Sequence, residues 1–180
     1  MSILDLLRLG SQKGGQSSAD TDTVRKITES LDQLEPSRAR YVAAFAYLLS
    51  RVARADLKIS PEEIRMMERI VTEIGGLPEA QAVIVVQIAK TQNILFGGTE
   101  DYLVAREFNS VAGKEQKLAL LHCLFAVAAA HQSVSTVEDN QISQIADELR
   151  IEHRDFIAVR SSYREHLAVL KPEAPPDPAG

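Results

Sequence analysis

The chain has 180 residues, of which 45% are apolar and 25% are charged, and its formal net charge is −5. This apolar content excludes a disordered chain, and the acidic balance argues against broad nucleic-acid binding, which rewards a clustered positive surface. A lone cysteine, Cys123, excludes an internal disulfide, and no apolar run reaches the ~20 residues that span a bilayer.

The two ends of the chain differ in composition from its body. Residues 1–20 combine a short amphipathic segment, which includes Ile3, Leu4 and Leu6, with a stretch rich in Gly and Ser that is typical of a flexible linker. Residues 171–180 carry four prolines, which cannot continue a helix, and we expect a disordered tail there. The predicted folded domain covers residues 21–170.

Helical periodicity runs through this body. Apolar residues spaced three and four apart predict a helix that begins near residue 21, and Pro36 is well placed to open a second that runs to Val52. Pro78 opens another helix, and we interpret the β-branched run 83–86 as part of it because one isolated strand would leave its backbone groups unpaired. Four further helices are predicted over residues 100–111, 114–130, 136–149 and 153–170. The fold class is therefore all-α, a single compact bundle of about seven helices.

One helix has unusually clear start and stop signals. Ser60 is suited to cap it, Pro61 fits its first turn, and Glu63 stands where it completes a capping box. Gly75 and Gly76 end the helix, because glycine accepts a left-handed C-terminal turn.

The sequence repeats itself with a shift of 75 residues. The capping serines Ser60 and Ser135 coincide, as do the glutamates Glu63 and Glu138, and apolar positions such as Ile70 and Ile145 follow. Each half consists of a long apolar helix, a short turn and a capped amphipathic helix. Such a pair cannot bury both apolar faces alone, so we predict that the two halves pack around one core with pseudo-twofold symmetry.

The first repeat turn resembles the TerB-like tellurite-resistance family, which includes the N-terminal domain type of the membrane-anchored co-chaperone DjlA. The resemblance rests on Asp56, Ile59, Ser60 and Glu63 after an alanine-rich helix, with a weaker copy before Glu138, and it covers most of the folded body. It implies an all-helical fold with two similar halves, an acidic turn that binds divalent cations, and a link to stress responses and membrane complexes. The sequence departs from the family pattern at Leu57, where glycine is usual, and at His131-Gln132, where Asp-Gly is usual.

The two repeat turns form the candidate metal site. Asp56, Glu62 and Glu63 in the first turn offer the hard oxygen ligands that calcium or magnesium prefers. In the second turn, His131 beside Glu138 and Asp139 suits zinc or manganese better; no other cofactor is implied. The alternative is structural, because Asp56 can brace its own turn and the two glutamates already have a role in the capping boxes.

No enzyme motif is recognisable in the chain. Cys123 lies in an apolar stretch and is interpreted as a buried core residue, and its neighbour His122 points in another direction on the same helix. The four histidines lack the spacing of a metal-ligand pair. We therefore expect a protein that is not an enzyme.

The sequence favours a non-catalytic TerB-like module that acts as a scaffold or sensor in a bacterial stress response. One alternative is an adaptor recruited to a larger assembly or membrane complex through its N-terminal segment; another is a metal-dependent enzyme that uses the repeat turns. We expect a protein partner, which includes the option of a homodimer, no nucleic acid and no transmembrane segment. The expected location is the cytoplasm, with peripheral contact to the inner membrane as the alternative.

Overall fold

The computed structural model describes residues 3–5, 18–53, 60–95, 101–130 and 133–170. Within these ranges there are eight labelled α-helices, two short 3-10 helices and no strand, which confirms the all-α class. In chain order the elements are α2 Ser18–Asp32, α3 Pro36–Val52, α4 Pro61–Glu73, α5 Glu79–Leu95, α6 Asp101–Val111, α7 Lys114–Ala129, α8 Thr136–Glu148, α9 His153–Ser161, η1 Arg164–His166 and η2 Ala168–Leu170.

The predicted repeat is visible in the helices. Both ends of α4 and α8 lie 75 residues apart, and each of these helices follows one of the two long apolar helices, α3 and α7. The long helix of each half contacts the capped helix of the other half, so that α3 packs on α8 and α4 packs on α7. This reciprocal exchange is what a pseudo-twofold arrangement around one core requires.

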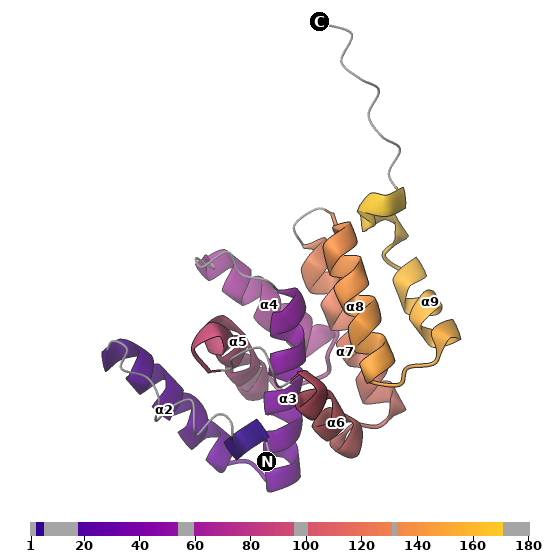
Figure 1. Cartoon of the computed structure of the whole chain (residues 1–180). Coiled ribbons are helices and arrows are strands. Elements are labelled where there is room, and N and C mark those ends of the chain that lie inside the picture. The colour runs from indigo at the N-terminus through magenta and orange to yellow at the C-terminus, as the bar shows by residue number, and fades with distance from the viewer. Residues whose placement is uncertain (1–2, 6–17, 54–59, 96–100, 131–132, 171–180) are drawn as a thin grey trace, which may run out of the picture.

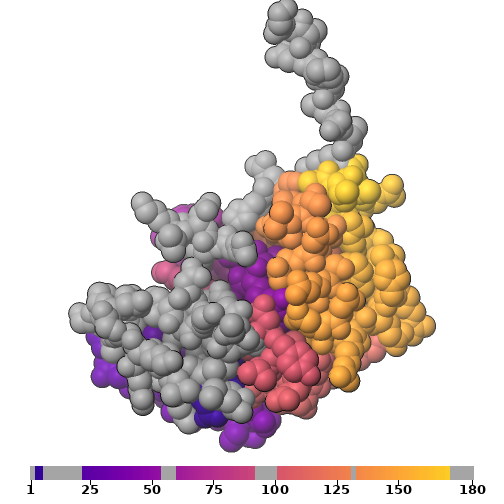
Figure 2. Space-filling view, viewed as in Figure 1, coloured from indigo at the N-terminus to yellow at the C-terminus, as the bar shows by residue number. Residues whose placement is uncertain are grey.

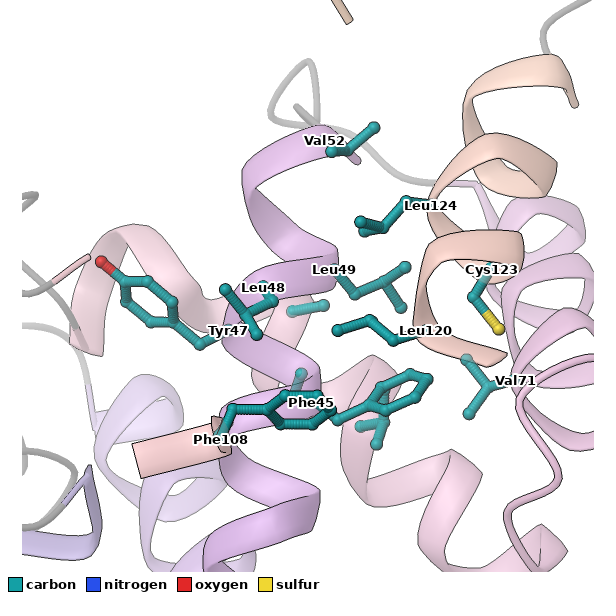
Figure 3. Close-up of a cluster of buried hydrophobic side chains, with 14 of the residues drawn as sticks. Phe45, Tyr47, Leu48, Leu49, Val52, Val71, Phe108, Leu120, Cys123 and Leu124 are labelled. Atoms are coloured by element: carbon teal, nitrogen blue, oxygen red, sulfur yellow. The ribbon is translucent and has the colours of Figure 1, made fainter. Parts of the chain in front are cut away.

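The core is centred on α3, which lies in the middle of the bundle (Figure 1). Nearly every side chain of α3 from Ala39 to Val52 is buried, because α5, α6, α7 and α8 all pack against this helix. Figure 3 shows how Leu49 of α3 meets Leu120 of α7, while Cys123 of α7 lies beside Val71 of α4. The β-branched run 83–86 lies within α5, as predicted.

The prediction for the last helix is wrong beyond its middle. α9 ends at Ser161, and the chain continues through η1 and η2. Leu167 is buried, and the backbone on either side of it pairs with Val134, whose N–H donates to His166 O at 2.7 Å and whose carbonyl accepts from Ala168 N–H at 2.9 Å. This pairing with a distant residue replaces the helical hydrogen bonds that the local periodicity predicted.

The two capping boxes are present, and their removal gives a first prediction. Ser60→Ala and Ser135→Ala are each expected to lower the free energy of unfolding by about 1 kcal/mol, since each serine side chain accepts a backbone N–H at the start of α4 or α8. Urea denaturation measures the change. Ser110→Ala, at an exposed helix position, is the control and should have almost no effect; a similar loss in all three variants would contradict the capping role.

Candidate functional site

The first repeat turn leads into α4 through a tightly bonded cap. Ser60 N–H donates to Glu63 Oε2 at 2.6 Å, and Glu63 N–H donates to Ser60 Oγ at 3.2 Å. The neighbouring Glu62 extends into solvent, where its carboxylate accepts from Arg65 Nη2 at 3.0 Å. Glu63 therefore takes part in the capping box. For Glu62, the structure describes only the exposed ion pair with Arg65.

The second repeat turn has the same cap and a stronger ion pair. Ser135 N–H and Oγ both bond to Glu138 Oε2, at 2.8 and 2.7 Å. The carboxylate of Asp139 accepts hydrogen bonds from two nitrogens of Arg160, from Nε at 2.9 Å and from Nη2 at 2.6 Å. The side chain of Asp139 is 13% exposed. The hydrogen bond to Asp139 raises the pKa of Arg160 above its ordinary value. This contact ties the start of α8 to the end of α9.

The predicted metal ligands divide between these two turns. Asp56 and His131 lie outside the described residues. Glu62 and Glu63 come together at the start of α4, and Glu138 and Asp139 at the start of α8, each with a partner inside the protein. No three His, Cys, Asp or Glu side chains in the described part of the chain are grouped so that they could hold a metal ion. The capping roles of Glu63 and Glu138 are thus confirmed, and the cation site stays a prediction.

A buried charged cluster that we did not expect from the sequence joins three helices. The side chain of Arg51, at the end of α3, is 5% exposed. Its Nη1 and Nη2 donate to the two carboxylate oxygens of Glu148 on α8, at 2.6 and 3.1 Å, and its Nε lies 3.6 Å from Asp101 Oδ2 on α6. Tyr47 Oη donates to the other oxygen of Asp101 at 2.6 Å. The signal in the sequence is an arginine within the apolar helix α3, at the position where the second repeat has Ala126.

Cys123 is buried, as predicted. Its Sγ lies 3.7 Å from Ile70 O, and burial raises the pKa of its thiol to about 12. The thiol is therefore protonated at neutral pH and a poor nucleophile, because the thiolate is the reactive form. The ring of His122 instead lies near Tyr163, with Nδ1 3.4 Å from Oη, and burial lowers the pKa of His122.

Part of the N-terminal segment lies against the domain itself. Ile3 is buried, and its N–H donates to Glu107 Oε2 on α6 at 2.6 Å. An adaptor role that used Ile3 would therefore require its release from α6. Leu6, Leu7 and Leu9 lie outside the described residues, and recruitment through this segment stays a prediction.

Comparison with known protein families gives a match over most of the folded body. The family model described as tellurite resistance protein TerB matches residues 42–161, from within α3 to the end of α9, which is more than half of the chain. No curated protein and no solved structure matches the chain. Among the described residues, no helix has the length and the apolar character needed to cross a membrane.

Proposed function

Because the chain belongs to the TerB family, we propose that it is a non-catalytic helical module that acts as a scaffold or sensor in a bacterial stress response. In the sensor role, the module binds a divalent cation at the turn that precedes α4. The family match supports the module as a whole, since it spans most of the first repeat, all of the second and both turns.

The exposure of Glu62 is the observation that carries the cation site. Its side chain is 74% exposed and its partner Arg65 is 69% exposed, so the ion pair between them is worth less than about 1 kcal/mol. A cation can therefore displace Arg65 at small cost. Glu62 follows Asp56 closely in the sequence, and two carboxylates with backbone carbonyls are the oxygen ligands that calcium or magnesium takes. The second turn is a weaker candidate, because Asp139 would have to leave a buried contact with Arg160.

A cation that binds only the native state must raise the melting temperature. With calcium, magnesium, zinc or manganese at ten times the dissociation constant, we expect about 1.4 kcal/mol of added stability, which thermal denaturation detects. The double variant Asp56→Asn, Glu62→Gln should lose the shift produced by calcium or magnesium.

The matched control lies on α2, where Asp22 forms an exposed ion pair with Arg25 at 3.1 Å and the same spacing of three residues. Asp22→Asn should keep the full shift. If millimolar cation leaves the melting temperature of the unmodified chain unchanged, the sensor part of the proposal is wrong and only the scaffold part remains.

A further inference from the structure

An apolar groove runs between α4 and α7, outside the two repeat turns. It is a shallow, open hollow of about 420 Å³. Ala126, Ala129 and Ala130 line one side, at and just after the end of α7, and Ile70 and Ile74 line the other, at and just after the end of α4. Tyr163 and His166, which follow α9, also line the groove. We call this surface the α4–α7 groove. Its volume falls in the range of ligand pockets.

The repeat relates this groove to a second one, between α8 and α3, which α6 fills. Figure 2 shows α6 packed against the end of α8 without a hollow between them, and α6 contacts both α3 and α8. Asn109 of α6 donates to Glu148 O at 2.9 Å, and Asp101 of α6 lies beside Arg51. The molecule thus shows directly that an amphipathic helix fits a groove of this construction.

Equivalent residues of the two grooves differ in exposure. Leu149 is fully buried at the end of α8, whereas its equivalent Ile74 at the end of α4 is 38% exposed. Ile145 is also fully buried, whereas its equivalent Ile70 is half-buried. The α4–α7 groove, although Tyr163 and His166 border it, is therefore less covered than the equivalent surface of the other half.

Besides the cover of α6, a difference in side-chain size between the repeats contributes to the hollow. The 75-residue shift places Arg51 over Ala126. On the α8–α3 side, the guanidinium of Arg51 fills the space and binds Glu148. On the α4–α7 side, an alanine stands in that place and leaves the space empty, although Glu73, the equivalent of Glu148, is still present at the rim.

We propose that the α4–α7 groove binds an amphipathic helix of a partner protein, which presents an apolar stripe like that of α6 and a carboxylate toward Arg69. This inference rests on the scaffold role proposed above and names the surface that serves it. The apolar stripe follows from α6, whose buried side chains are Val104, Ala105 and Phe108. The carboxylate follows from charge: Arg69 lines the groove together with Glu73 and His166, and among the described residues no ion pair joins Arg69 to another side chain.

The α6 sequence itself is the first probe. A fluorescent peptide of residues 98–113, acetylated and amidated at its ends, is titrated with the full chain while its anisotropy is followed. The peptide carries the apolar stripe and the acidic residues Glu100, Asp101 and Glu107. We expect saturable binding, and a peptide with Phe108→Ala should bind at least tenfold more weakly. Measurement in EDTA separates this test from that of the cation site, because loss of the cation does not remove the groove.

Variants of the chain locate the binding site. Ala129→Leu fills the groove and should raise the dissociation constant at least tenfold, and Arg69→Glu should raise it by reversing the charge at the rim. Glu115→Leu makes a comparable change on an exposed part of α7 outside the groove and should bind like the unmodified chain. Thermal denaturation checks that each variant is folded.

Two results would overturn the proposal. One is the absence of saturable binding up to about 1 mM peptide, where the binding free energy is only about −4 kcal/mol. The other is equal binding to Ala129→Leu and to the unmodified chain, which would mean that the peptide binds elsewhere, for example by displacing α6 from its own place.

Discussion

Replacing Arg51 by methionine is expected to lower the free energy of unfolding by about 3 kcal/mol. Removing one partner of a buried ion pair typically costs 3–5 kcal/mol, because the remaining charge is left without compensation. The loss should lie at the low end of that range, since the side chains of Glu148 and Asp101 are 20% and 40% exposed and regain part of their hydration. Urea denaturation of the full chain measures the effect.

The matched control is Arg65→Met on α4, which removes an arginine from the exposed pair with Glu62. It should cost less than about 1 kcal/mol. A double-mutant cycle with Glu148→Gln then isolates the interaction between Arg51 and Glu148. If the two methionine variants were equally stable, the buried cluster would contribute no more than a surface ion pair, and its role in joining α3 to α8 would be refuted.

Local signals were sufficient to predict most of the helices. The start of α4 is encoded by Ser60, Pro61 and Glu63, because an N-cap depends on residues within one turn of each other. The same signals recur at α8, so a search for repeats could find the two halves and their shared core. The interpretation of residues 83–86 as helical also succeeded, because a lone strand has no partner for its backbone.

Contacts between distant residues could not be predicted in this way. The capping role of Glu138 can be predicted from the neighbouring residues. In contrast, Asp139 binds Arg160, 21 residues away, and Arg51 binds Glu148, 97 residues away. The early end of α9 has the same cause, since Leu167 is drawn toward Val134 by packing and backbone pairing. A period of 3.6 residues shows which face is apolar and says nothing about which distant partner that face will meet.

The α4–α7 groove could be predicted from the sequence only in part. One difference that contributes to it, arginine in one repeat and alanine in the other, is visible when Arg51 is aligned with Ala126. Its significance is visible only in three dimensions, because it depends on α6 packing against α8, at whose end Leu149 is buried, while Ile74 stays exposed. A comparison of the two halves within one molecule therefore shows a surface that neither half shows alone.

Gly75→Ala is expected to destabilise the protein by about 3 kcal/mol, the upper part of the usual range for overpacking a core. A Cβ atom at this position would lie 2.5 Å from Val71 O, 3.1 Å from Cys123 Sγ and 3.2 Å from Phe45 Cζ. Val71 O cannot move freely, since it accepts a hydrogen bond from Leu77 N–H at 3.3 Å in the turn after α4. The backbone of this turn would have to shift away from α3 and α7.

Gly76→Ala is the matched comparison, and the sequence alone assigned both glycines the same role. Gly76 has a φ of 68°, and a Cβ there would meet nothing within 4 Å, so the substitution costs only the strain of a left-handed alanine, about 1 kcal/mol. Thermal or urea denaturation of the two variants should therefore rank Gly75→Ala as the more damaging. Alanine reduces the flexibility of the unfolded chain equally in both variants. The difference between their free energies of unfolding therefore measures the effect of the close contact between a Cβ atom at position 75 and Val71 O. The reverse order would show that backbone conformation, not the contact with Val71, is what requires glycine at the end of α4.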